Sequence, residues 1–313
     1  MSEEKPKNIT NDLVYHELSR KYPRLLLAVA NEAHGTSYTG DEAITLGSDE
    51  HYWMEPNGEI EKRVSDTNMI VNVESGLNQE RLHFECQSRD DANMPERIAR
   101  YETLISLENC VIVENVCTVK LPLATVVYLT GKRETPKELV VHILTKDGSL
   151  WHKIPTLKAF NYSMKKLLER KLFLLIPFHI VVYKNRISSY NKNEEELKAL
   201  QKIYQDMVKH LDLLMQDKQL SQDEVRDILI VSEEMINKVA KKHKKVRKAL
   251  GDILRGPVYE LPTDRLIRQG RQEGLVQGRI DMCVQLVKKG VVTLQQAATQ
   301  LGITEEEFKA KMS

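Results

Sequence analysis

The sequence predicts a mixed α/β or α+β protein, with a central sheet flanked by helices and an all-helical extension behind it. Two observations predict this class. The first 160 residues read in order as helix, strand-like runs, helix and further strand-like runs, which is the order of a helix-flanked sheet. From about residue 191 the pattern becomes helical and highly charged. We therefore expect a sheet domain (1–190), a charged helical domain (191–255) and a C-terminal segment (256–313) made of a linker, a Gly/Arg-rich helix and a helical hairpin.

Composition limits the function classes. Of the 313 residues, 41% are hydrophobic and 29% are charged, which suits a soluble globular chain. The 46 basic and 45 acidic residues give a net charge of +1, so any nucleic-acid binding must come from local patches. The longest apolar run, residues 172–183, is shorter than the roughly 20 residues that cross a bilayer. The polar amino terminus and four cysteines without metal-ligand spacing predict a cytoplasmic protein with no membrane partner.

The elements follow in order along the chain. A helical stripe that includes Leu25, Leu26 and Val29 predicts a helix over residues 12–34, ended by Gly35. Residues 59–73 read as one or two strands, 74–80 as a turn and 81–87 as the next strand. A helix should follow Asn93, and strand-like runs return at residues 117–131 and 138–146.

The stretch "RLHFECQS", residues 81–88, has an unusual second face. Side chains alternate across a strand, so Leu82, Phe84 and Cys86 share an apolar face. The other face then carries Glu85 and Gln87. Taken alone, such a pair would fit an ordinary solvated surface.

The preceding hairpin adds a second carboxylate. A turn centred near Gly76 would pair residues whose numbers sum to about 153, which brings Asp66 beside Gln87. Asp66, Glu85 and Gln87 should then gather at the open end of the hairpin. Two carboxylates held so close repel each other unless a cation lies between them. The sequence therefore predicts a cation site at this end.

These motifs resemble a known nuclease superfamily. An Asp at the start of one strand, a hairpin, and Glu-x-Lys or Glu-x-Gln on the next strand is similar to the PD-(D/E)XK nucleases. More narrowly, "NEAHGTSYTGDE", "RVSDTNMIV", "LHFECQSRDDANMPERIARYE" and the tail "GRQEGLVQGR" resemble the transposase-associated recombination-promoting nucleases. The resemblance covers roughly residues 12–160 and the tail.

The resemblance implies a PD-(D/E)XK restriction-endonuclease-like core and metal-dependent hydrolysis of DNA phosphodiester bonds. It implies that Asp66 and Glu85 hold Mg²⁺ or Mn²⁺, and that Glu32 is an auxiliary acid unless it is a solvated helix residue. Gln87 stands where many members carry Lys, and an amide can donate hydrogen bonds but adds no charge. The alternative is a catalytically weak or inactive nuclease-fold module that binds DNA or protein. Mobile-element transfer, recombination and defence all fit, and DNA is not distinguished from RNA.

Two groups of basic residues are candidate contacts to phosphates. Arg97 and Arg100 share a helix face, and they either contact phosphates or form salt bridges with Glu96 and Glu102. Residues 238–248 carry seven basic side chains in eleven positions. This run is either a solvated helix surface or a patch for DNA. Its candidate contacts are Lys241, Lys242, Lys244 and Lys245.

The C-terminal segment suggests self-association. "LQQAATQLGITEEEF" fits a helix-turn-helix or an oligomerising helical hairpin, and the acidic start of its second helix favours the hairpin. Gly270, Gly274 and Gly278 recur every four residues, a spacing that lets another helix approach closely. We therefore expect a homo-oligomer formed through these helices.

Overall fold

The computed structural model describes residues 10–48, 50–54, 60–64, 66–73, 78–88, 91–108, 110–132 and 134–256, with positions 284, 287, 293–295, 298 and 308. Contacts divide the chain into two compact units, Met1–Gly256 and Pro257–Ser313. The expected boundary after residue 255 falls one residue from this division, and the expected boundary after residue 190 lies inside the first unit. The predicted turn position Gly76 lies outside the described residues.

The N-terminal helical segment is interrupted once. It consists of α1 (Asn11–Lys21), the 3-10 turn η1 (Pro23–Leu25) and α2 (Leu26–His34). The prediction of one helix over residues 12–34 is therefore wrong at Pro23, because proline offers no backbone N–H and disfavours helical backbone in the residue before it. The predicted end is confirmed, since Gly35 caps α2 with a left-handed φ of 68°.

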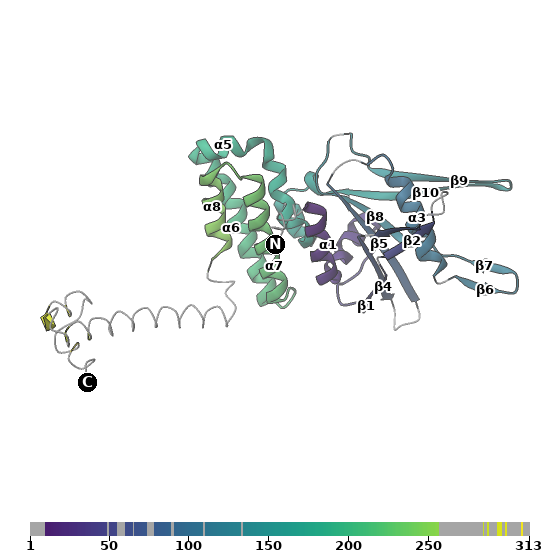
Figure 1. Ribbon diagram of the computed structural model, residues 1–313, viewed down its shortest axis with the longest axis horizontal. Coiled ribbons are helices and arrows are strands. Elements are labelled where there is room, and N and C mark those ends of the chain that lie inside the picture. Colours follow the sequence, from purple (N-terminus) through teal and green to yellow (C-terminus); the bar gives the residue numbers. More distant parts are fainter. Residues whose placement is uncertain are drawn as a thin grey trace, which may run out of the picture. The chain divides into compact units, whose positions relative to one another are not determined.

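A six-stranded mixed sheet forms the centre of the first unit (Figure 1), and its strand order is β1-β4-β5-β8-β10-β9. Strands β5, β8 and β10 are parallel neighbours, and the other pairs are antiparallel. The mixed α/β class is thereby confirmed. The sheet strands are β1 (Ile44–Leu46), β4 (Thr67–Val73), β5 (Asn78–Gln87), β8 (Leu123–Tyr128), β9 (Glu138–Thr145) and β10 (Gly148–Lys158). Two separate ribbons pair β2 (Glu50–Met54) with β3 (Ile60–Val64), and β6 (Val111–Val113) with β7 (Val116–Thr118).

Helices cover both faces of the sheet. On one face, Met94 and Ile98 of α3 (Met94–Leu107) pack into a buried cluster with Val126 of β8 and Ile154 of β10. On the other face, His34 of α2 lies 2.9 Å from the hydroxyl of Thr125, measured from Nε2. Since Thr125 and Val126 point to opposite faces of β8, the sheet is enclosed on both sides.

Helices follow the sheet from residue 159 onward, so the helical region begins before the predicted start at residue 191. Its elements are η2 (Ala159–Asn161), α4 (Met164–Glu169), η3 (Phe173–Arg186), α5 (Ile187–Lys192), α6 (Glu194–Gln216), α7 (Gln222–Val239) and α8 (Lys244–Leu254). The apolar run of the sequence forms η3, which is largely buried and contacts α7. Asn193 caps α6, and Ser221 forms a capping box with Glu224 at the start of α7.

In the second unit, Ala298 and Phe308 are buried and lie in helix. The glycines at 270, 274 and 278, and most of the predicted hairpin, lie outside the described residues. The homo-oligomer therefore stays a prediction.

Candidate functional site: a pair of opposed carboxylates

Asp66 and Glu85 lie opposite each other where β4 begins and β5 ends. The strand register pairs Thr67 with Phe84, so the next position brings Asp66 beside Glu85. The Asp66 N–H donates to Glu85 Oε1 at 3.2 Å. The predicted register, with Asp66 beside Gln87, is wrong by two residues. A shift of two leaves every side chain on its own face, so the apolar pattern could not distinguish the registers.

Glu85 is fully buried and has three neighbouring donors. Besides the Asp66 amide, Arg97 of α3 lies 3.1 Å from Oε2, measured from Nη2. The ring Nε2 of His83 lies 3.3 Å from Oε1. Arg97 also pairs with Asp91 at 3.2 Å. The Glu85 carboxylate is thus fixed in place by groups from three segments of the chain.

Asp66 is held less completely than Glu85. Its Oδ2 accepts the backbone N–H of Cys86. Burial, and then the negative charge of Glu85, raise the pKa of Asp66 from 3.8 to about 8. The charge of Asp12 acts in the same direction, and Arg97 opposes it. A carboxyl group with such a pKa becomes easier to ionise when a cation is placed beside it, so the pair suits a divalent ion.

Helix α3 explains why β5 has polar residues on its second face. His83 and Glu85 are both fully buried there, beneath α3 rather than in solvent. The His83 ring meets the ring of Tyr101 edge-on, with centroids 5.7 Å apart. Nδ1 of His83 has no hydrogen-bond partner among the described residues. Buried polar groups are costly unless they form hydrogen bonds with one another or with a ligand.

Helix α1 brings further titratable groups that sequence reasoning missed. Asp12 accepts the Ser88 hydroxyl at 2.6 Å, directly after the end of β5. The pKa of His16 is lowered by burial and by Arg20, while the charge of Glu85 opposes that shift. The signal was the position of Asp12 in the first turn of the first helix. Its contact with Ser88 depends on the packing of α1 beside β5, which the sequence pattern does not show.

Glu32 contacts a different part of the fold. Its Oε1 accepts the Tyr162 hydroxyl at 2.9 Å, and its Oε2 lies 3.7 Å from Arg170. In the described part of the chain these are the contacts recorded for its side chain, and neither belongs to the Asp66–Glu85 pair. Its role as auxiliary acid stays a prediction.

Gln87 is half-buried on β5 and lies two residues beyond Glu85, on the same side of the strand. Its backbone carbonyl accepts the N–H of Leu129 at 2.9 Å. The side chain is thus placed near the pair by the strand.

The two arginines of α3 form ion pairs within the protein. Arg100 pairs with Glu96 at 2.6 Å, one of the two predicted alternatives. Arg97 binds Glu85 and Asp91, which neither alternative named. Glu102 instead lies 3.0 Å from His152.

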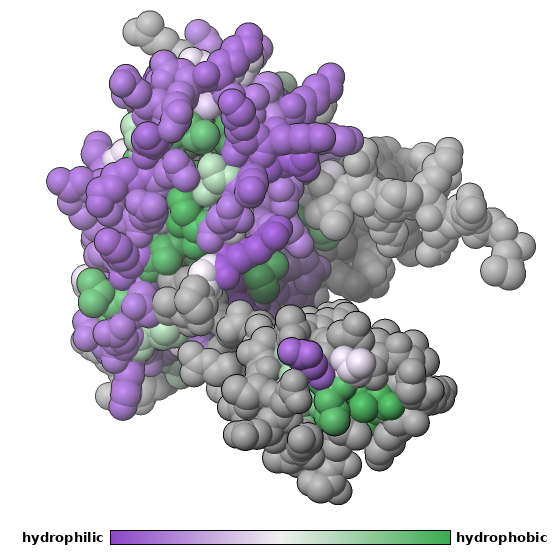
Figure 2. Space-filling view, turned by 90° about the vertical axis from the view of Figure 1, so that its left-hand side faces the viewer, coloured by the Kyte–Doolittle hydropathy of each residue, from purple (hydrophilic) through white to green (hydrophobic). Residues whose placement is uncertain are grey.

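The lysine run is divided by a helix boundary. The prediction of one helix over residues 238–248 is wrong, because α7 ends at Val239 and α8 begins at Lys244. Lys241 and Lys242 lie in the turn, Lys244 and Lys245 open α8, and all four are exposed. Figure 2 shows that this end of the first unit is mostly hydrophilic. Exposure allows both readings of the run, so its binding to DNA stays a prediction.

The donor set fits a hard divalent cation with few protein ligands. Among the residues that the structure describes, no group of three or more His, Cys, Asp and Glu side chains is arranged around a common metal position. Asp66 and Glu85 offer carboxylate oxygens only. Mg²⁺ commonly keeps several waters and uses one or two carboxylates.

Comparison of the chain with protein-family models, curated proteins and solved structures finds no match. Within the described residues, none of the helices has the length and apolar character that crossing a membrane requires.

Proposed function

We propose that the protein is a metal-dependent endonuclease that hydrolyses DNA phosphodiester bonds, with Asp66 and Glu85 as the ligands of Mg²⁺ or Mn²⁺. The observation that carries the proposal is the placement of Asp66 opposite Glu85, where the Asp66 N–H donates to the buried Glu85 carboxylate at 3.2 Å. Burial, and then the charge of Glu85, raise the pKa of Asp66, which agrees with this placement. Such an arrangement gains stability from a bound cation. The resemblance to the PD-(D/E)XK nucleases gives the same two residues the same role.

The surrounding residues have separate tasks in this proposal. A divalent ion held there would acidify a water molecule and neutralise charge on the phosphate. The Cys86 N–H orients the carboxylate of Asp66, and Arg97 orients the carboxylate of Glu85. The amide of Gln87 can position a water by hydrogen bonding, although it supplies no charge.

A second candidate function is a nuclease-fold module that binds DNA or protein and cuts weakly or not at all. The specific observation in its favour is the ion pair between Arg97 and Glu85. A guanidinium already neutralises one of the two carboxylates, so less charge remains to attract a metal. Gln87 in place of Lys favours the same reading.

A cleavage assay tests the proposal. Purified protein is incubated with supercoiled plasmid in Mg²⁺, in Mn²⁺ and in chelator. Asp66→Asn and Glu85→Gln should each lower the nicking rate at least about 100-fold, since each removes a proposed ligand of the metal ion. Glu102→Gln is the matched control, because Glu102 is also a buried carboxylate and lies on α3.

Metal binding provides a readout that is independent of cutting. Calorimetric titration with Mn²⁺ should show one binding event in the wild type and in Glu102→Gln, and none in Asp66→Asn. Metal binding without cleavage would favour the second candidate. Wild-type Mn²⁺ binding by folded Asp66→Asn would contradict the site assignment itself.

A further inference from the structure

Three open cavities adjoin one another at the junction of the sheet and the helical extension. The first, of about 680 Å³, shares Arg24, Lys218 and Leu220 with a second of about 640 Å³. It shares Arg170 with a third of about 500 Å³. The shared residues make the three cavities neighbours, and we call them together the basic groove.

The groove is strongly biased toward positive charge. Seven lysines and arginines line its three parts, against the three acids Glu32, Asp41 and Glu169. Neither Lys171 nor Lys218 forms an ion pair with a described residue. The third cavity adds three lysines, namely Lys137, Lys158 and Lys166. Such a surplus concentrates anions locally even though the chain as a whole is nearly neutral.

Two of these lysines have a backbone conformation that favours glycine. Lys171 has φ 56° and Lys218 has φ 59°, and each follows the end of a helix, α4 or α6. Among the described residues only three non-glycine positions have positive φ, and two of them line the same cavity. Left-handed backbone costs a residue with a Cβ about 1–2 kcal/mol. Glycine would end both helices more favourably, so a lysine at either position lowers the stability of the fold.

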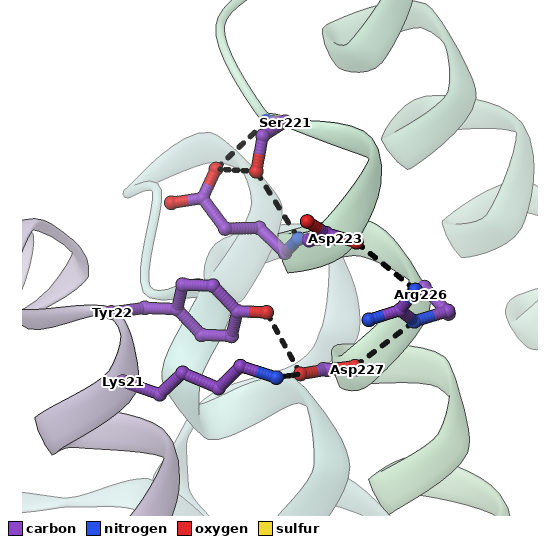
Figure 3. Close-up of polar contacts among 7 residues, drawn as sticks. Lys21, Tyr22, Ser221, Asp223, Arg226 and Asp227 are labelled. Atoms are coloured by element: carbon purple, nitrogen blue, oxygen red, sulfur yellow. Dashed lines mark hydrogen bonds and ion pairs between the residues drawn. The ribbon is translucent and has the colours of Figure 1, made fainter.

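The turn that carries Lys218 is braced against the first helical segment. Tyr22 donates its hydroxyl to Asp227 of α7 at 2.7 Å, and Lys21 pairs with the same carboxylate (Figure 3). Arg24 donates from Nε to Glu224 at 2.6 Å and from Nη2 to the Gln219 carbonyl at 3.0 Å. The backbone turn that carries Lys218 is therefore tied to the first helical segment, and Lys218 and Arg24 line the same cavities.

The groove begins at the same sheet edge as the carboxylate pair. The strand register aligns Gln87 of β5 with Tyr128 of β8, and Tyr128 with Lys158 of β10. Lys158 thus lies on the same face as Gln87, two strands away. At the usual strand spacing this is about 10 Å. The sheet thus links one residue of the groove, Lys158, to the end of β5 that carries Gln87 and Glu85.

We propose that the basic groove binds the phosphate backbone of a nucleic acid and guides it to the carboxylate pair. This rests on the proposed nuclease function and assigns its substrate contacts. A polymer fits better than a small anion, because the cations are spread over three adjoining cavities and not gathered around one centre. Lys171 and Lys218 also complement the negative ends of two helices, so the test must separate a binding role from a capping role.

The double variant Lys171→Gly/Lys218→Gly makes this separation. Glycine relieves the left-handed strain, so the midpoint of thermal unfolding should stay equal or rise. If each lysine contacts one phosphate, the slope of log K against log salt should fall by about 1.8 for duplex DNA, and affinity by about 10- to 100-fold near 0.1 M salt. Binding is measured by fluorescence anisotropy in chelator, with duplex DNA, single-stranded DNA and RNA of equal length. These arms identify which nucleic acid supplies the phosphates.

Two further variants complete the experiment. Lys171→Asn/Lys218→Asn removes the same charge while keeping a residue that tolerates left-handed backbone, and it should reproduce the loss. Lys198→Gln/Lys202→Gln removes two exposed lysines of α6 and should change the slope little. Wild-type affinity and slope in both groove variants, or no binding of any nucleic acid by the wild type, would overturn the proposal. Normal binding by the wild type and by Asp66→Asn without any cleavage would leave the groove standing and remove the nuclease function.

Discussion

Two groups of buried acids pack in the layer between α3 and the sheet, and they differ in how their charge is balanced. Glu102 is almost fully buried and lies 3.0 Å from one basic partner, Nε2 of His152. Burial raises the pKa of Glu102 and the histidine opposes the shift. Asp66 and Glu85 instead place two carboxylates opposite each other, and the guanidinium of Arg97 pairs with Glu85 alone of the two. The first group can be neutral as a unit, whereas the second retains a negative charge when both carboxylates ionise.

The difference shows that burial of a carboxylate does not by itself mark a functional site. We infer that the surplus of negative charge at Asp66 and Glu85 is the more informative sign, because it makes the local stability depend on an external cation.

The largest effect is expected for Arg97→Met, which removes the guanidinium that pairs with Glu85 in the described part of the chain. Breaking a buried ion pair leaves an uncompensated charge, so the free energy of unfolding at pH 8 in chelator should fall by about 3–5 kcal/mol. Mg²⁺ or Mn²⁺ should recover part of this loss. Urea denaturation followed by circular dichroism measures both values.

The matched control is Lys153→Met, which breaks an exposed pair with Glu138. It should cost less than about 1 kcal/mol and should not respond to metal. If the Arg97→Met protein is as stable as this control, the Asp66–Glu85 pair carries no surplus of negative charge.

A smaller effect is expected for Glu102→Gln. The amide keeps a hydrogen bond to His152 but loses the charge, at a cost of about 1–3 kcal/mol. Because Glu102 lies outside the proposed metal site, Mn²⁺ affinity and plasmid nicking should match the wild type. A loss of metal binding in a folded Glu102→Gln protein would erase the distinction between the two groups.

The pH dependence of stability should separate the groups further. In the folded protein the pKa of Asp66 is about 8, against 3.8 when unperturbed. The unfolded chain therefore releases this proton at lower pH than the folded chain. The contribution of Asp66 is fully present below about pH 3.8 and is lost as pH rises to about 8, at up to about 1.4 kcal/mol per pH unit.

This loss is measured as the difference between wild type and Asp66→Asn in chelator, by denaturation from pH 5 to pH 8. The difference should shrink in saturating Mg²⁺. Parallel stability curves for the two proteins would contradict the raised pKa.

The sequence predicted the faces of β4 and β5 because alternation is a local property. Met69, Leu82 and Phe84 are buried as the pattern required. It did not predict the register, since the length of the hairpin turn is not encoded in a two-residue period. It also did not predict that α3 would close over Glu85.

The partners of the pair depend on long-range packing. Arg97 was identified as a possible phosphate contact from its helix position, but its contact with Glu85 requires the crossing of α3 over β5. Asp12 was missed because its contact with Ser88 requires α1 to pack beside the end of β5. Glu32 was assigned through the family resemblance, and the fold places it against Tyr162.

The smallest effect is expected for Gln87→Lys, which adds the charge that the resemblance associates with this position. Residues two apart on a strand are about 7 Å from each other, so the added ammonium should stabilise the ionised pair by about 1 kcal/mol. The pKa of Asp66 should then fall, and the loss of stability in chelator should end at a lower pH and be smaller in total. Gln87→Met, which has similar length and no charge, should leave the pH curve unchanged. If the protein is a nuclease limited by charge at this position, Gln87→Lys should also nick plasmid faster. A shifted pH curve without faster nicking would show that the added ammonium lies close to Asp66 and Glu85. It would also favour the binding module over the enzyme.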